Sequence, residues 1–332
     1  MNSFGHIEHI YHSINSSAMK GITKKKKVLI CDKVDSLMLD ELNKREFDVN
    51  YEPEITSMKL KDSIEKYDIV ILRSRTKLTQ DILERAVNLK IIARAGIGVD
   101  NIDTKYAKSR NIQVITAAGS STHSVAELNV ALAISLARNL IPLDINSKNG
   151  IWIKDTGFEL SGKTAGIIGF GRIGLSTATI LRSIGMEILA YDIFENNEAI
   201  NGVGGHFVSM NELLSNSDFI FILVTLTDSS SNIIGEEQMK MVKSGSFLIN
   251  TSRSEVIDGR VLLNYLESGR IKGYATDVLW NEPPTEEWEK TLISKPNVIV
   301  TPHIGAQTVE AQKRVAEYTL NNLFAKISEM GI

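Results

Sequence analysis

Three polar side chains of complementary chemistry occur late in the chain, each close behind an apolar run that we expect to form a strand. They are Arg253, Glu282 and His303, and the runs end at residues 250, 276 and 300. In a parallel α/β sheet, ligands bind beside the carboxyl ends of the strands. There an imidazole can give or take a hydroxyl proton, a carboxylate can hold and charge that imidazole, and a guanidinium can grip a substrate carboxylate. The set suits hydride transfer to a carbonyl group, although three unrelated polar loop residues would show the same spacing.

A glycine-rich motif in the middle of the chain predicts a dinucleotide site. The apolar run Thr164–Ile168 leads into a G-x-G-x-x-G motif, and apolar residues at helical spacing follow it. The glycines are Gly169, Gly171 and Gly174. The first permits a tight turn, the second lets a pyrophosphate approach the backbone, and the third lets the helix pack on the strand. The free N–H groups of the first helical turn then face the phosphates.

An acidic residue closes the next apolar run, which begins at Met186. This residue is Asp192, and the residues after it, Ile193 and Phe194, carry no charge. A carboxylate at this position accepts hydrogen bonds from the ribose hydroxyls of NAD and repels the 2′-phosphate of NADP. We therefore predict NAD rather than NADP as the cofactor.

The elements that must position these residues follow a regular order. Short apolar runs alternate with helical patterns between residues 28 and 115, and the alternation resumes at Thr164. This order is typical of parallel sheets with helices on both faces. We therefore predict an α/β protein with two doubly wound parallel-sheet domains, in which a Rossmann NAD-binding domain is inserted in a flavodoxin-like substrate domain. We expect 24–122 and 307–332 to form the substrate domain and 123–306 the NAD-binding domain, since the last helical pattern is expected to return to the first domain.

The first half has a glycine signal of its own. Gly96, Ile97 and Gly98 follow an apolar run, so their backbone N–H groups are expected at a strand end where anions bind. A simple tight turn explains the glycines equally well. The segment Arg73-Ser74-Arg75-Thr76 also follows an apolar run, so its two arginines are expected near the same strand ends. The alternative is that both arginines are ordinary surface charges.

The longest helical pattern runs from Ser124 to Leu140. Its apolar residues lie on more than one face, and Glu127 stands three residues after Ser124, as in a capping box. A helix that is apolar nearly all round must be buried on several sides. We expect it at the hinge between the domains, and we predict a two-fold homodimer, or a tetramer built from it, through this segment.

Composition narrows the class of protein. The 332 residues are 43% hydrophobic and 23% charged with a formal net charge of -3, as in a soluble globular protein, so we expect neither nucleic acid nor a membrane as partner. No apolar segment reaches 18 residues, and residues 1–23 lack the apolar stretch of a signal peptide. We expect a cytoplasmic protein with a flexible extension at 1–23 and no metal site, although that extension contains His6, His9 and His12. Cys31 is the single cysteine and is expected to be buried at a strand end.

Taken together, these motifs resemble those of the D-isomer-specific 2-hydroxyacid dehydrogenases. The resemblance runs from about Val28 to Ala325. It is carried by five segments: Arg94–Asp103, the glycine-rich loop with Arg172-Ile173, Ile249–Arg253, Asp277 to Pro283, and Thr301–Gly305. The resemblance implies that Arg253, Glu282 and His303 form the catalytic triad of an NAD-dependent oxidoreductase. It also implies that NAD meets, besides the three motif glycines, Thr76, Arg172, Ile173, Asp192, Thr251, Asp277, His303, Gly305 and Ala306.

The resemblance gives an expectation for the substrate as well. Gly96 to Gly98 with Arg253 would bind a substrate carboxylate, and Arg73 and Ser74 lie among the expected substrate contacts. Within the family, the resemblance implies a member that oxidises D-3-phosphoglycerate to 3-phosphohydroxypyruvate, on the route to serine. The phosphate of this substrate demands cations, for which Arg73, Arg75 and Lys154 are the candidates.

Two alternatives remain open at the level of sequence. Within the enzyme class, the alternative is a glyoxylate or hydroxypyruvate reductase. In another class, some relatives bind NAD and act as transcriptional corepressors, and turnover of a 2-keto acid with NADH separates the two. Ser254 and Thr225 replace residues that are often Gly and Pro in the family, which affects loop shape more than chemistry. No regulatory extension is expected after Ile332, so feedback by serine through such a domain is not expected.

Overall fold

The computed structural model describes residues 25–332, so the predictions for residues 1–23 and their three histidines lie outside the described residues. The described chain falls into two compact units. Residues 25–33, 39–93 and 101–114 form the smaller unit, and residues 34–38, 94–100 and 115–332 form the larger one. This division groups 307–332 with the larger unit, whereas the sequence predicted their return to the first domain. The predicted domain boundaries therefore stay a prediction.

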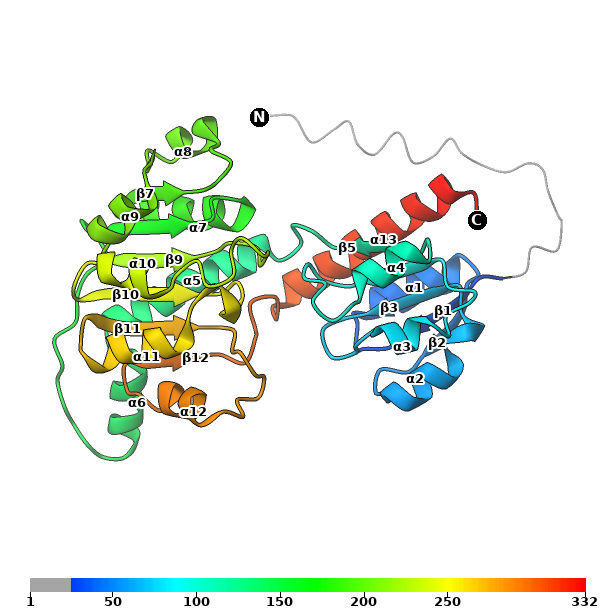
Figure 1. Ribbon diagram of the computed structural model, residues 1–332, viewed down its shortest axis with the longest axis horizontal. Helices are drawn as coiled ribbons and strands as arrows, with labels where there is room; N and C mark the ends of the chain where they lie inside the picture. The colour runs from blue at the N-terminus through cyan, green and yellow to red at the C-terminus, as the bar shows by residue number, and fades with distance from the viewer. Residues whose placement is uncertain (1–24) are drawn as a thin grey trace. The chain divides into compact units, whose positions relative to one another are not determined.

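The smaller unit contains a five-stranded parallel sheet of order β2-β1-β3-β4-β5. Val28 of β1 lies opposite Val49 of β2 and Ile69 of β3, and all four residues of β3 are buried. The order is that of flavodoxin-like sheets. The strands are β1 (Lys27–Ile30), β2 (Asp48–Tyr51), β3 (Ile69–Leu72), β4 (Ile91–Arg94) and β5 (Gln113–Thr116). The intervening helices are α1 (Ser36–Lys44), α2 (Ser57–Ser63), the 3-10 helix η1 (Ile64–Lys66), α3 (Gln80–Leu83) and α4 (Thr104–Ser109) (Figure 1).

The larger unit contains a seven-stranded parallel sheet of order β12-β11-β10-β9-β6-β7-β8. The order extends the doubly wound dinucleotide-binding arrangement by one strand, and its switch point lies between β6 and β9. The predicted fold class, two parallel-sheet α/β domains, is confirmed. The strands are β6 (Thr164–Ile168), β7 (Glu187–Tyr191), β8 (His206–Phe207), β9 (Phe219–Ile222), β10 (Ser246–Asn250), β11 (Ile271–Thr276) and β12 (Val298–Val300).

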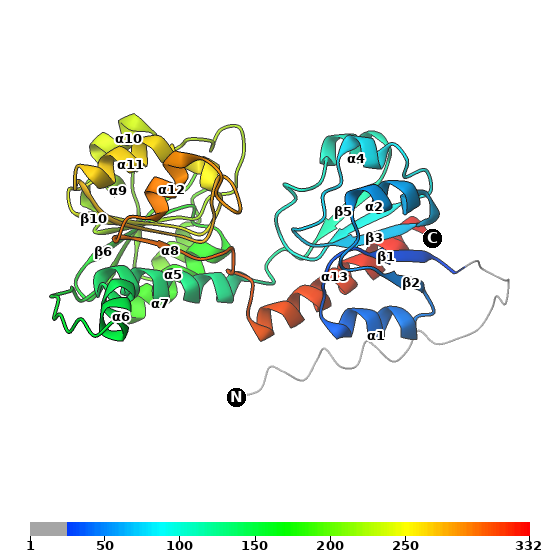
Figure 2. The ribbon, with the colours of Figure 1, turned by 90° about the horizontal axis from the view of Figure 1, so that it is seen from below.

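Helices cover both faces of this larger sheet. Figure 2 shows α5 and α7 on one face and α9 to α12 on the other. Phe219 and Phe221 of β9 pack on the α5 face, while Ile220 and Ile222 pack on the opposite face, as the two-residue period of a strand requires. The helices of this unit are α5 (Thr122–Ala137), α6 (Leu140–Lys148), α7 (Arg172–Ser183), α8 (Asn197–Gly202), α9 (Met210–Asn216), α10 (Glu236–Met241), the 3-10 helix η2 (Ser254–Val256), α11 (Gly259–Glu267), α12 (Glu287–Ile293) and α13 (Val309–Met330).

The start of α5 differs from the predicted one. The helix begins at Thr122, and Ser124 lies inside it rather than at its cap, so the predicted capping box is wrong. Ser124 is buried, and its hydroxyl donates to the carbonyl oxygen of Gly305 at 2.6 Å. The side chain therefore ties α5 to the loop after β12 instead of closing the helix end.

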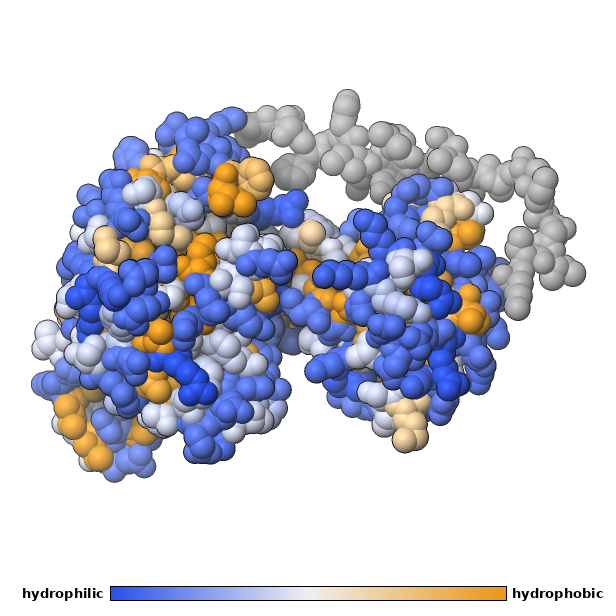
Figure 3. Space-filling view, in the orientation of Figure 1, coloured by the Kyte–Doolittle hydropathy of each residue, from blue (hydrophilic) through white to orange (hydrophobic). Residues whose placement is uncertain are grey.

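The apolar surface predicted on α5 lies elsewhere. Most of the apolar residues of α5 are buried, and Asn139, with φ 51°, separates it from α6. Exposed apolar side chains occur instead on α6 and on the segment after it, where Figure 3 shows apolar surface at the lower left. They are Leu140, Ile141, Ile145, Ile151, Trp152 and Ile153. Between residues 25 and 332 no single helix is long and apolar enough to span a membrane; α5 and α6, bent by 65°, meet that criterion only as a pair.

Candidate active site

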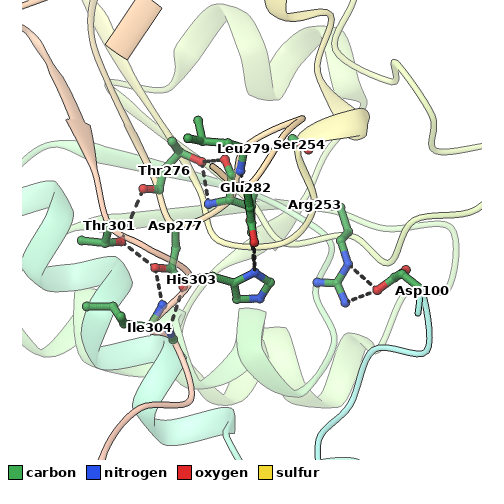
Figure 4. A network of polar contacts seen from close by, with 12 residues as sticks. Asp100, Arg253, Ser254, Thr276, Asp277, Leu279, Glu282, Thr301, His303 and Ile304 are labelled. Atoms are coloured by element: carbon green, nitrogen blue, oxygen red, sulfur yellow. Dashed lines mark hydrogen bonds and ion pairs between the residues drawn. The ribbon is translucent and has the colours of Figure 1, made fainter. Parts of the chain in front are cut away.

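Glu282 and His303 come from the loops that follow two neighbouring strands, β11 and β12. The His303 Nδ1 atom lies 3.1 Å and 3.2 Å from the two carboxylate oxygens of Glu282 (Figure 4). Both side chains are nearly half exposed, at 44% and 43%, so this pair contributes little to folding. Its geometry instead suits a half-open site where an imidazole meets a substrate.

Electrostatics fix the protonation of the pair. Burial by itself would raise the pKa of Glu282. The hydrogen bond and charge of His303, with the Leu279 N–H and the charge of Arg253, outweigh burial and hold that pKa below its usual range. An ionised carboxylate only accepts hydrogen bonds, so Nδ1 of His303 carries the proton. The Nε2 atom is then left to exchange a proton with a substrate.

Asp277 fixes the turn that carries His303 by hydrogen bonds to the residues on either side of it. His303 has φ 54°, in the left-handed region that few residues other than glycine adopt. The buried Asp277 Oδ1 accepts hydrogen bonds from the Thr301 hydroxyl at 2.6 Å and the Ile304 N–H at 2.7 Å, and Oδ2 accepts from the Gly305 N–H at 2.7 Å. Asp277 therefore anchors the His303 loop. A contact of Asp277 with NAD, which the resemblance implies, stays a prediction.

Arg253 follows β10 and is already paired with a carboxylate of the chain. Its Nε and Nη2 atoms donate to Asp100 Oδ2 at 3.0 Å and 2.8 Å (Figure 4). Burial would raise the pKa of Asp100, but the hydrogen bonds and charge of Arg253 outweigh it and lower that pKa. Gly98 packs so closely here that a Cβ on it would overlap the guanidinium. The structure thus brings Gly98 and Arg253 together, and a substrate carboxylate that binds the same nitrogens must replace Asp100.

Each glycine of the motif occupies a distinct environment. Gly169, with φ 96°, lies at the switch point, where an added Cβ would be 2.7 Å from the carbonyl carbon of Leu223. Gly171 has nothing within 4 Å of such a Cβ, which leaves its backbone open to a ligand. Gly174 packs directly on the Gly169 carbonyl. Arg172 and Ile173 form the first turn of α7, whose N-terminal N–H groups suit a pyrophosphate.

Asp192 stands beside this loop with a fixed orientation. Its Oδ2 accepts a hydrogen bond from the Phe170 N–H at 2.7 Å, and its Oδ1 accepts one from the Phe194 N–H at 3.0 Å. Ile193 and Phe194 are exposed and apolar, so neither supplies a positive charge to the surroundings of the carboxylate.

Asp192→Ala is expected to weaken NAD binding and to narrow the preference for NAD over NADP. The variant lacks the carboxylate that is predicted to accept hydrogen bonds from the ribose hydroxyls and to repel a 2′-phosphate, and each charge-assisted bond is worth about 1.5–3 kcal/mol. Kd values of wild type and variant for both cofactors measure the effect, with the exposed Glu195→Ala as control. Wild-type enzyme that binds and uses NADP as well as NAD would refute the assignment.

Other predicted cofactor residues have partners inside the protein. The buried Thr76 hydroxyl donates to Asp32 Oδ1 at 2.7 Å, and the Thr251 hydroxyl donates to Asn129 Oδ1 at 2.7 Å. Ala306 lies half-buried beside Gly305 in the His303 loop. The contacts of these residues with NAD stay predictions.

The three candidate phosphate-binding cations differ in the structure. The Arg75 guanidinium is engaged within the smaller unit: it pairs with Asp32 at 3.0 Å and donates to backbone carbonyls that include those of Ile55 and Pro53. These contacts occupy the donors of Arg75 that a phosphate would need. Arg73 is half-buried, Ser74 beside it is exposed, and Lys154 is exposed in the larger unit.

Sequence reasoning missed two further residues. Asp100 lies in a segment that the sequence singled out, but nothing in its spacing indicates that it pairs with Arg253. Glu289 of α12 reads as an ordinary acidic residue of a first helical turn, yet it is fully buried against the loop that carries Glu282. Only the contacts of these carboxylates in the folded chain identify their partners, which are Arg253 for Asp100 and the loop donors for the buried Glu289.

Known proteins match both the sequence and the fold. Residues 130–305 match the D-isomer specific 2-hydroxyacid dehydrogenase, NAD binding domain. A hydroxypyruvate reductase of Thermotoga maritima is 41% identical over 88% of this chain and 94% of its own length. A D-3-phosphoglycerate dehydrogenase of Archaeoglobus fulgidus is 36% identical over 87% of this chain, which spans only 55% of that relative. A solved glyoxylate reductase from Paecilomyes thermophila superposes with a TM-score of 0.83 at 27% identity and covers 92% of this chain and 96% of its own.

The fold, the glycine-rich turn and these matches define an NAD-dependent oxidoreductase. The chain belongs to the D-isomer-specific 2-hydroxyacid dehydrogenase family.

Proposed function

We propose that this dehydrogenase interconverts D-3-phosphoglycerate and 3-phosphohydroxypyruvate, in the direction that feeds serine biosynthesis. The observation that carries the proposal is that Arg73 is half-buried and that its guanidinium bonds no carboxylate of the described residues. Burial lowers the pKa of its guanidinium against the opposing charge of Asp32. Within residues 25–332 this guanidinium donates to the Lys33 carbonyl, at 3.2 Å, and to no carboxylate. A half-buried cation without a bonded carboxylate suits the phosphate of a ligand.

The Arg253, Glu282 and His303 side chains supply what the reaction at C2 needs. When bound, NADH provides the hydride that adds to the keto carbon. His303 gives its Nε2 proton to the carbonyl oxygen, and Glu282 holds the imidazole by Nδ1 throughout. Arg253, with the Gly98 backbone, holds the substrate carboxylate, so that C2 faces the imidazole. Oxidation of the hydroxy acid runs through the same contacts in reverse.

Arg73→Gln is expected to raise KM for 3-phosphohydroxypyruvate about 10-fold or more and to leave KM for hydroxypyruvate nearly unchanged. One charge-assisted contact with the phosphate is worth about 1.5–3 kcal/mol, and 1.4 kcal/mol is tenfold. Steady-state kinetics with both keto acids measure the effect, and Lys77→Gln, an exposed cation of the same loop, is the control. An equal change in KM for both substrates would contradict a phosphate role for Arg73.

The second candidate function is a hydroxypyruvate or glyoxylate reductase. It is favoured by the hydroxypyruvate reductase that aligns with nearly the whole chain and by the engagement of Arg75 inside the protein. In this case Arg73 would be a structural cation, and the unphosphorylated keto acid would be the better substrate.

We propose further that the protein is a homodimer joined through the exposed apolar residues of α6 and the segment 151–153. Trp152 is 82% exposed, and five further apolar side chains of α6 and this segment are also exposed. Gathered apolar surface of this kind is typical of protein–protein interfaces. Light scattering is expected to give about twice the 36.7 kDa chain mass, and Trp152→Glu should lower it toward that of one chain. Wild-type monomer at micromolar concentration would refute the proposal.

A further inference from the structure

Glu282 lies near the middle of the loop 277–286, which joins β11 to α12. The loop is exposed at Asn281, Glu282 and Pro283, so little packing fixes the Glu282 side chain directly. Its Oε1 accepts one hydrogen bond from the Leu279 N–H at 3.2 Å. Some other contact must therefore hold this part of the loop at a constant distance from His303.

Glu289 supplies such a contact from behind the loop. Its side chain is fully buried, and its Oε1 accepts a hydrogen bond from the Asn281 N–H at 2.9 Å. Its Oε2 accepts three more, from Asn281 Nδ2 at 2.9 Å and from the N–H groups of Thr285 at 3.3 Å and Glu286 at 3.1 Å. The four donors bracket Glu282, one residue before it and three and four residues after it.

The charge state of Glu289 matches this role. Burial would raise the pKa of Glu289, but the hydrogen bonds from Asn281, Glu286 and Thr285 outweigh it and hold the pKa below its usual range. An ionised carboxylate accepts at both oxygens, whereas an amide accepts at one and donates at the other. In either orientation a glutamine at this position would turn its NH₂ group toward a donor.

A helix cap alone does not explain these contacts. Glu289 is the third residue of α12, and a capping box accounts for its interaction with Glu286 at the helix start. The bonds to Asn281 and Thr285 reach out of the helix into the loop. Trp280 of the loop also packs edge-on against Trp288 of α12, with ring centroids 4.9 Å apart. The helix thus grips the loop at several points around Glu282.

We propose that Glu289 is a positioning residue for catalysis, which holds the loop so that the Glu282 carboxylate stays within hydrogen-bond distance of His303. The inference rests on the proposed roles of Glu282 and His303. Without Glu289, both Glu282 and His303 would be present, but the carboxylate would lie in the wrong place relative to the imidazole. A misplacement of about 1 Å can cost 10²-fold in rate.

The test compares Glu289→Gln with Glu282→Gln and with Glu287→Gln, an exposed carboxylate of the same helix whose side chain is 88% accessible. We expect Glu289→Gln to lower kcat for keto-acid reduction about 10-fold to 100-fold while Kd for NADH, from fluorescence titration, stays unchanged. Reduction needs the protonated imidazole, which faces the Glu282 carboxylate and the Arg253 guanidinium. Displacement or loss of the carboxylate therefore moves the alkaline fall of kcat to lower pH in both variants, but not in Glu287→Gln.

The double variant Glu282→Gln/Glu289→Gln decides whether Glu289 acts through Glu282. We expect it to be no slower than Glu282→Gln alone, because residues that act as a unit are not additive. Asn281→Ala, which removes one donor from an exposed position, should give a smaller loss of the same kind and covers the case in which Glu289→Gln does not fold. Additive losses, or lower thermal stability with unchanged kcat and pH profile, would overturn the inference alone. Full activity of Glu282→Gln would overturn the proposed pair and the inference with it.

Discussion

His303→Ala is expected to lower kcat by about 10²–10⁴ while NADH binding stays close to that of wild type. The variant keeps the hydride donor and the substrate contacts but has no group to give the proton to the carbonyl oxygen, and acid–base help of this kind is worth that factor. His303 is 44% exposed and lies outside the core, so the fold should tolerate the change. Stopped-flow reduction of the keto acid, with NADH titrated separately, measures both quantities.

A histidine remote from the proposed chemistry provides the control. His206 is exposed on the edge strand β8, and His206→Ala should leave kcat unchanged. A His303→Ala variant with kcat near the wild-type value would remove His303 from the mechanism.

Arg253→Leu is expected to lower kcat/KM for 2-keto acids by about 10²–10⁴. The guanidinium offers two nitrogens, Nε and Nη2, in a fork that Asp100 occupies at 3.0 Å and 2.8 Å. A substrate carboxylate that takes this place gains two charge-assisted hydrogen bonds of about 1.5–3 kcal/mol each. Leucine keeps much of the volume but offers neither bond.

Arg253→Lys separates charge from geometry. It keeps a cation without the planar fork, so its kcat/KM should lie between those of wild type and Arg253→Leu. Unchanged KM and kcat in Arg253→Leu would show that the substrate carboxylate binds elsewhere. A matched loss of NADH affinity would show that the arginine acts through the fold instead.

Much of the architecture followed from short-range patterns. The strand Thr164–Ile168 has the predicted bounds, and β10, β11 and β12 end at the predicted residues 250, 276 and 300, because each closes a short, mainly apolar run. Short helices such as α8, α9 and α12 were not predicted, since six or seven residues are too few to show a clear period. The start of α5 was misplaced because Ser124 carries a capping pattern, but its hydroxyl bonds Gly305, far along the sequence.

In the candidate site, too, the positions that follow strands could be predicted, whereas the contacts of the side chains could not. Arg253, Glu282 and His303 could be predicted because parallel strands bring their carboxyl ends to one edge, and the structure places His303 against Glu282. The partners of polar side chains could not be predicted. Asp100 on Arg253 and Asp32 on Arg75 depend on tertiary contacts between distant segments, which leave no local period in the sequence. The donors to Glu289 lie within eight residues of it, but they belong to an irregular loop whose path no sequence period indicates.

The most direct test of the proposed function is the ratio of kcat/KM for 3-phosphohydroxypyruvate to that for hydroxypyruvate, measured with wild-type enzyme and NADH at neutral pH. The phosphate is proposed to bind Arg73 and a second cation, for which Lys154 is the remaining candidate. Two contacts of about 1.5–3 kcal/mol each should then favour the phosphorylated substrate by roughly 10²-fold or more. A higher kcat/KM for hydroxypyruvate or glyoxylate would contradict the proposal and identify the enzyme as a reductase of unphosphorylated keto acids.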